Sequence, residues 1–93
     1  MKLSGKQVAA ARELLGLSQT DLATAAGLAR LTVSRFEAGV APLKPSTLRL
    51  IQAELERRGI EFSNGTGIGV RLNFEKAAEF ARSTAKLGAA PEK

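Results

Sequence analysis

Arginine and hydroxyl side chains recur on one side of the segment from Arg30 to Glu37. On a helical wheel of about 100° per residue, Val33 and Phe36 share one face. The opposite face carries Arg30, Leu31, Ser34 and Arg35. Arginine makes paired hydrogen bonds to O6 and N7 of guanine, and leucine can contact the methyl group of thymine. The segment is therefore predicted to present base-contacting side chains to the major groove of DNA. The alternative is an ordinary solvated helix face that happens to carry two arginines.

The residues before this segment predict a second short helix that would hold it in place. Ser18 is a suitable N-cap, and Asp21 lies three residues further on, near the positive end of the helix dipole. Leu17 and Leu22 have the spacing of a hydrophobic staple. Gly27 suits the left-handed turn that ends a helix. A capped helix, a glycine turn and a matching core face together favour groove contact over the solvated face.

Four helices are expected within residues 1–59, because each candidate segment has its own stop signal. They run from about Lys6 to Leu15, from Gln19 to the residue before Gly27, from near Arg30 to the residue before Gly39, and from near Pro45 to the residue before Gly59. Ser4 and Gln7 have capping-box spacing at the start of the first. Proline is well tolerated in the first turn of the last. These signals predict a compact helical unit.

The pattern changes to alternation after residue 59. Apolar residues there alternate with polar residues or glycine, which predicts a β-hairpin with a loop at residues 63–67. A loop of about five residues would place Phe62 opposite Ile68 and Ile60 opposite Val70, whereas a two-residue turn at residues 64–65 would put Ile68 and Val70 on the opposite face. Asn73 is expected to cap a last helix that ends near Leu87, and residues 88–93 are expected to form a flexible tail.

Composition narrows the classes of function. The chain has a net charge of +5, of which residues 1–58 contribute +4 (9 Lys and Arg against 5 Asp and Glu), so a polyanionic partner is expected for that part. The sequence contains no cysteine and no histidine, which excludes disulfides, thiol chemistry and imidazole catalysis. No apolar run is long enough to cross a membrane and no export signal is evident, so a cytoplasmic protein is expected.

The segment resembles the helix-turn-helix of the Xre family and of phage repressor and Cro proteins, over roughly Val8 to Arg58. The matching residues are Gln19, Ala23, Gly27, Val33 and the run from Phe36 to Gly39. The resemblance implies a mainly α fold, in which a four-helix domain like that of lambda repressor occupies residues 1–59. The hairpin and last helix, residues 60–87, would follow it. It also implies a bacterial regulator that works at the nucleoid.

The resemblance assigns roles to further residues. The family contacts the DNA backbone at the positions of Gln19, Lys44, Ser46 and Thr47. Thr32 lies on the border of the exposed face and is expected to reach the DNA backbone, with a base contact as the alternative. Arg12 and Glu37 match a structural ion pair between the first and third helices. Two positions depart from the family pattern: Ala29 replaces the usual Ser or Thr cap of the third helix, and Leu31 is apolar where a polar residue is usual.

A dimeric repressor on a palindromic operator is the expected function, because members of the family bind two half-sites as two-fold dimers. The residues expected to form the dimer interface are Ile60, Phe62, Val70, Phe74 and Phe80. Covering the helical core is the alternative role for them. The antitoxin of a toxin–antitoxin pair, with the C-terminal segment bound to a protein partner, is the alternative function, although a folded hairpin argues against it. The sequence shows no catalytic constellation, no metal site and no cofactor motif.

Overall fold

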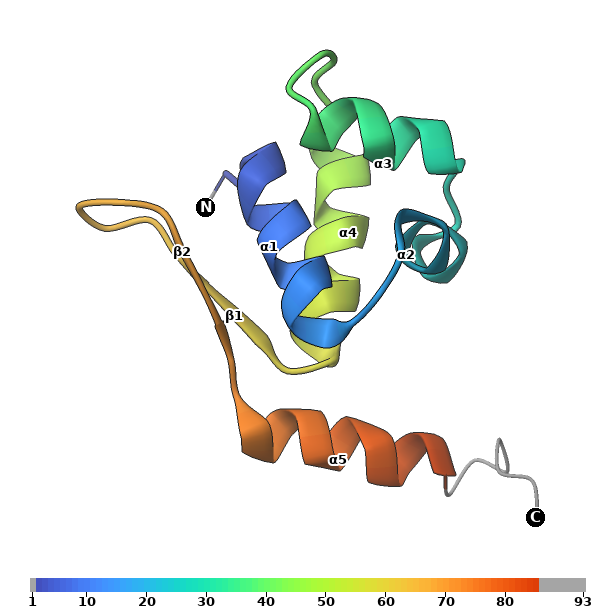
Figure 1. Ribbon diagram of the computed structural model, residues 1–93, viewed down its shortest axis with the longest axis vertical. Helices are drawn as coiled ribbons and strands as arrows, with labels where there is room; N and C mark the ends of the chain where they lie inside the picture. Colours follow the sequence, from blue (N-terminus) through green and yellow to red (C-terminus); the bar gives the residue numbers. More distant parts are fainter. Residues whose placement is uncertain (1, 86–93) are drawn as a thin grey trace.

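The computed structural model describes residues 2–85 as a mainly helical chain with one β-hairpin (Figure 1). The elements are α1 (Gly5–Leu15), α2 (Gln19–Ala26), α3 (Arg30–Glu37), α4 (Pro45–Arg57), β1 (Ile60–Ser63), β2 (Gly69–Leu72) and α5 (Phe74–Thr84). This order confirms the predicted fold class. The expected end of the last helix at Leu87 and the expected tail at residues 88–93 lie outside the described residues.

Local capping explains where the first two helices begin and end. The Ser4 side chain accepts a hydrogen bond from the backbone of Gln7, and the Gln7 side chain accepts one from the backbone of Ser4. Ser18 and Asp21 form the same reciprocal pair at the start of α2. The hydrogen bond from the Ser18 backbone, followed by the one involving its side chain, lowers the pKa of Asp21. Both helices end at a glycine with positive φ, as the sequence predicts.

The core lies where α1, α2, α3 and α4 meet, and it extends to the first residue of β1. Its buried apolar side chains are Leu3, Val8, Ala11, Leu22, Ala23, Val33, Ile51, Leu55 and Ile60. Gly5 permits the close approach of α1 to the end of α3, because a Cβ at this position would overlap the Phe36 carbonyl. No helix among residues 2–85 is both long enough and apolar enough to cross a lipid bilayer.

The hairpin register differs from the prediction by two residues along β2. Phe62 pairs with Val70 and Ile60 with Leu72, and the loop covers residues 64–68. The expected loop length is therefore right, but the loop lies one residue later than expected. The side-chain amide of Gln7 donates to the carbonyls of Ser63 and Gly69, the first pair of the hairpin, and so fixes where it closes. A shift of two residues keeps the apolar side chains on one face.

The last helix lies at one end of the molecule and α3 lies at the other (Figure 1). Asn73 caps α5 by accepting a hydrogen bond from the backbone of Lys76 at 3.0 Å. Its own backbone donates to the Gly59 carbonyl at 2.8 Å. None of the residues Phe74–Thr84 is buried, so α5 contributes little to the core.

Candidate nucleic-acid interface

The outer face of α3 carries the four side chains that the sequence assigns to base contacts. Val33 is buried, and this inward anchor turns Arg30, Leu31 and Arg35 outward, where all three are exposed. Ser34 is half-buried between them. Leu31 is 49 % exposed, so its apolar side chain is accessible on this face. The helix that carries these side chains, α3, lies at one end of the molecule (Figure 1).

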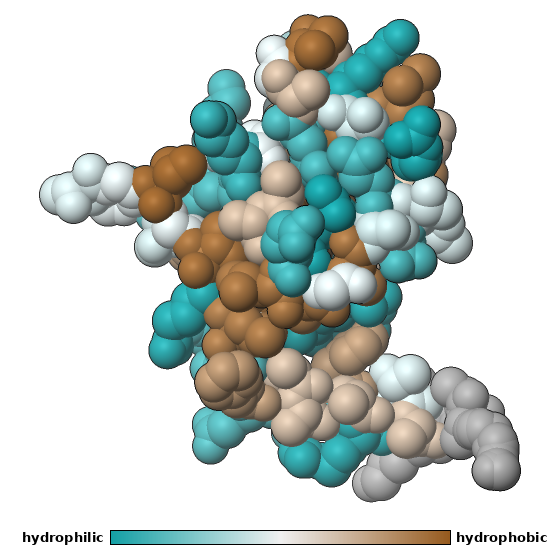
Figure 2. Space-filling view, viewed as in Figure 1, coloured by the Kyte–Doolittle hydropathy of each residue, from teal (hydrophilic) through white to brown (hydrophobic). Residues whose placement is uncertain are grey.

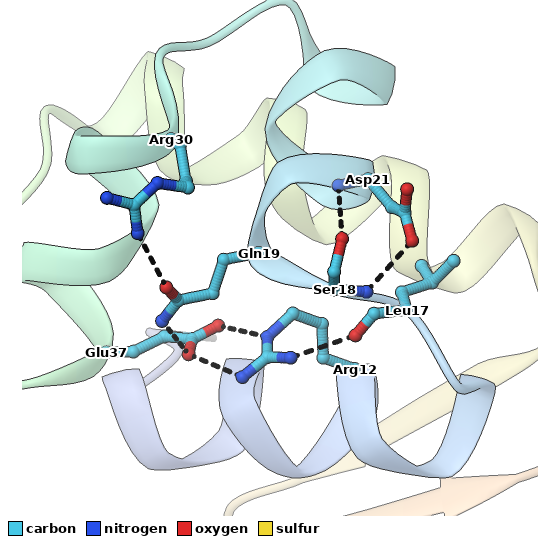
Figure 3. Close-up of polar contacts among 7 residues, drawn as sticks. All are labelled: Arg12, Leu17, Ser18, Gln19, Asp21, Arg30 and Glu37. Carbon is cyan, nitrogen blue, oxygen red and sulfur yellow. Dashed lines mark hydrogen bonds and ion pairs between the residues drawn. The ribbon is translucent and has the colours of Figure 1, made fainter.

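A chain of polar contacts ties α3 to the two helices before it (Figure 3). The guanidinium of Arg12 on α1 donates from Nε and Nη2 to the two carboxylate oxygens of Glu37 on α3, at 2.8 and 3.0 Å. Its third nitrogen, Nη1, donates to the carbonyl of Leu17 at 2.8 Å. The side-chain amide of Gln19, the first residue of α2, also donates to Glu37, at 3.0 Å. Arg30 in turn donates to the Gln19 oxygen at 3.4 Å.

The ion pair at the centre of this network is largely shielded from water. The side chains of Arg12 and Glu37 retain only 14 % and 6 % of their exposure. The hydrogen bond to Glu37 is the main cause that raises the pKa of Arg12 above its ordinary value. Two parallel hydrogen bonds between a guanidinium and a carboxylate fix geometry as well as charge. The pair therefore sets the position of α3 against α1.

Gln19 has a second role that sequence reasoning missed. The sequence suggests only a contact with the DNA backbone for this residue. In the structure, its amide connects Glu37 to Arg30, so it links the inner ion pair to the outer face of α3. Because residues 19 and 30 belong to different helices, only the packing of α2 on α3 reveals this connection.

The residues expected to contact phosphate lie at helix starts. Lys44 precedes Pro45 as the N-cap of α4, and its side chain makes no capping hydrogen bond. Lys44 and Ser46 are exposed, whereas Thr47 and Thr32 are half-buried. Backbone N–H groups in a first helical turn lack helical partners and suit an anion. Ala29 likewise leaves the start of α3 without a side-chain cap.

A comparison with family models identifies the type of domain. The helix-turn-helix model matches residues 8–62, from α1 into β1. The chain belongs to the Xre/Cro-like helix-turn-helix family. The helix-turn-helix is a DNA-binding regulatory domain, and α2 and α3 are its two defining helices. A comparison with curated proteins gave no match.

The residues expected at a dimer interface, which follow α4 in the chain, lie in different environments. Ile60 is only 1 % exposed and belongs to the core, so its side chain supports the hairpin from within. Phe62 and Val70 form a half-buried pair across the hairpin. The Phe80 ring lies against the guanidinium groups of Arg57 and Arg58. Phe74, by contrast, is 80 % exposed.

Proposed function

We propose that this helix-turn-helix protein is a sequence-specific transcriptional repressor that binds a palindromic operator as a homodimer. The observation that supports it best is the outer face of α3, where Arg30, Leu31 and Arg35 project from a helix that the Arg12–Glu37 pair holds in place. Rigid placement matters because base contacts require matched donor and acceptor positions. A promoter close to its own gene is the proposed target.

Within the proposed complex, α3 lies in the major groove. Arg35 and Arg30 donate to guanine edges, Ser34 bonds a neighbouring base, and Leu31 contacts a thymine methyl. Arg30 exchanges its weak bond to Gln19 for a base contact, which leaves the Gln19 oxygen without that donor. The Gln19 backbone amide then faces phosphate at the start of α2.

Backbone contacts on either side of α3 fix its register in the groove. Thr32 on α3 and the exposed Lys44 and Ser46 at the start of α4 are proposed to contact phosphates, together with Thr47. Such contacts carry no sequence information, but they position the base-contacting helix. The separation of roles makes the proposal testable with single substitutions.

Arg35→Ala is expected to weaken binding to the cognate operator by about 1–3 kcal/mol while it leaves binding to random DNA nearly unchanged, because a base contact is lost. Lys44→Ala is the matched comparison, and it should weaken both kinds of binding alike and reduce their salt dependence. Fluorescence anisotropy with an operator selected from a random duplex library measures both. Equal weakening by Arg35→Ala on the two DNAs would show that Arg35 contacts phosphate and would contradict the assignment.

A further inference from the structure

The last helix has one face that contacts the rest of the chain. Ala77 lies against Gly59, where a Cβ would come within 2.8 Å of the Ala77 nitrogen. The Phe80 ring lies 4.9 Å from the Cζ atoms of both Arg57 and Arg58. Glu54 accepts hydrogen bonds from both of these arginines at the end of α4. These contacts define the orientation of α5 against the body.

A second, apolar face of α5 has no contact of this kind. Phe74, Ala78, Ala81 and Ala85 are separated by four, three and four residues, which is the spacing of the a and d positions of a heptad repeat. All four are exposed, and Phe74 is the most exposed large apolar side chain among those described. In the space-filling view, the apolar surface of the hairpin and α1 continues onto α5 (Figure 2). The apolar surface is therefore larger than the apolar face of α5 alone.

Two charges flank this face in a pattern that fits a second copy of the chain. Glu75 and Arg82 both occupy the e position of the heptad, directly after Phe74 and Ala81. Seven residues separate them, so they lie roughly 10 Å apart along the helix and do not pair with each other. Within residues 2–85, neither forms an ion pair.

An antiparallel pair of α5 helices would satisfy both charges. In antiparallel coiled-coil packing, equal e positions face each other, so Glu75 of each copy would lie beside Arg82 of the other. Ala78 would then pack against Ala81 of the second copy, and Phe74 against Ala85. The small side chains at the centre allow the two helices to approach closely. A parallel pair would instead place e beside g, where Ala77 and Thr84 offer no charge.

The orientation of α5 also suits the proposed function. A two-fold axis that relates antiparallel helices is perpendicular to both of them. Because α5 runs across the long axis of the molecule, this two-fold axis can follow the long axis (Figure 1). Both copies of α3 then lie at the same end of the dimer, as two half-sites on one face of DNA require.

We propose that two copies of this chain associate through the apolar face of α5, with the two helices antiparallel and Glu75 paired with Arg82 of the second copy. This inference rests on the proposed function in one respect, the need for two α3 helices at one end. The chain contains no cysteine, so introduced cysteines report the pairing directly.

Disulfide cross-linking in full-length protein tests the register. Ala78→Cys and Ala81→Cys chains, one of them carrying a size tag, are mixed and oxidised. The mixed disulfide should exceed either homodimer, and Ser83→Cys, on the polar side of α5, should give little cross-linking with either variant. Three results would each overturn the proposed register: more Ala78→Cys homodimer than mixed disulfide, equal cross-linking by Ser83→Cys, or a wild-type chain that is monomeric. Chains that associate in solution without forming the mixed disulfide would overturn it as well.

Charge reversal provides an independent test without cysteines. Glu75→Lys and Arg82→Glu each create two like-charge contacts in their own homodimer, so each should dissociate roughly tenfold more readily than wild type. A mixture of the two variants restores both attractive contacts and should form heterodimers with near wild-type affinity. Sedimentation equilibrium at low salt measures all three. Homodimers of unchanged affinity, or a mixture no tighter than its components, would overturn the pairing.

Binding of the same proteins to a random-sequence duplex separates this inference from the proposed function. A monomeric chain that still binds DNA contradicts α5 pairing and leaves the proposed DNA binding intact. A chain that cross-links as expected but does not bind DNA supports the pairing and contradicts the proposed function.

Discussion

Gln7 connects the hairpin to the helical body. Its side chain is only 1 % exposed, and its Nε2 lies 2.8 Å from Asn64 Oδ1 and 3.2 Å from the Ser63 carbonyl. The sequence predicts the short-range part of this role, the capping box with Ser4. The contacts with the hairpin, 56 to 62 residues away, depend on how β1 and β2 pack beside α1, which no local pattern encodes.

Gln7→Leu is expected to destabilise the protein by about 2 kcal/mol, because it leaves the carbonyl groups of Ser63 and Gly69 without this donor. For a domain of this size, such a loss lowers the melting temperature by roughly 8–16 °C. Thermal unfolding followed by circular dichroism measures it. Gln52→Leu is the control, since Gln52 bonds only to the neighbouring Glu56 among the described contacts, and it should change stability by less than about 0.5 kcal/mol. Equal effects of the two substitutions would contradict the role of Gln7.

At the scale of elements, the helices follow from local signals and the hairpin does not. The start of α2 is encoded by Ser18 and Asp21, and its end by Gly27, all within ten residues. The hairpin register depends instead on the distant Gln7, whose amide donates to the carbonyls of Ser63 and Gly69. The alternation of apolar residues therefore predicts which side chains share a face of the hairpin. It does not distinguish between two pairings of the strands that differ by two residues.

Charged residues on the other side of the hairpin make its stability depend on pH. Glu61 accepts hydrogen bonds from Arg71 on the facing strand, from Lys76 and from Asn73, and these contacts, Arg71 first, lower its pKa from 4.5 to about 2. Protons therefore bind Glu61 more readily in the unfolded chain. The stabilisation is complete above about pH 4.5 and is lost as the pH falls toward 2.

Wild type is therefore expected to be more stable than Glu61→Gln at neutral pH, and the difference should disappear between about pH 4.5 and 2. Urea titrations of both proteins across this range measure it, and the comparison cancels the carboxylates that they share. Added salt should reduce the difference, because the contacts are exposed. A difference that persists unchanged at pH 2 would contradict the ionic origin of the effect.

At the scale of the whole molecule, the two proposed interfaces lie at opposite ends, with the core between them (Figure 1). The charge distribution and the helix-turn-helix pattern predict the DNA end from sequence alone, because its side chains lie on one short helix. For the end formed by α5, the sequence predicts only that the segment carries apolar residues. Whether Phe74 covers the core or remains exposed depends on where α5 docks, and the structure shows that it remains 80 % exposed.

A chain that ends at Leu72 tests the separation of these two ends. It keeps all the buried core residues and the Gln7 contacts. It loses α5, none of whose residues is buried, together with the contacts of Asn73 and Lys76 with Gly59 and Glu61. We expect this chain to remain folded and monomeric and to bind random DNA as the full chain does. Its affinity for the palindromic operator should fall on the order of a hundredfold, because the second half-site no longer binds as part of the same particle.

Light scattering and operator titrations measure both properties, and a chain that ends at Gly59 provides the contrast. That shorter chain also loses Ile60 from the core and the hairpin partners of Gln7. It should therefore be less stable to unfolding, besides being unable to dimerise. If the chain that ends at Leu72 still dimerises and binds the operator with undiminished affinity, then the hairpin or α1, rather than α5, holds the two copies together. The apolar surface that these elements share with α5 would then be the interface, and the two-fold axis would have to pass beside the hairpin (Figure 2).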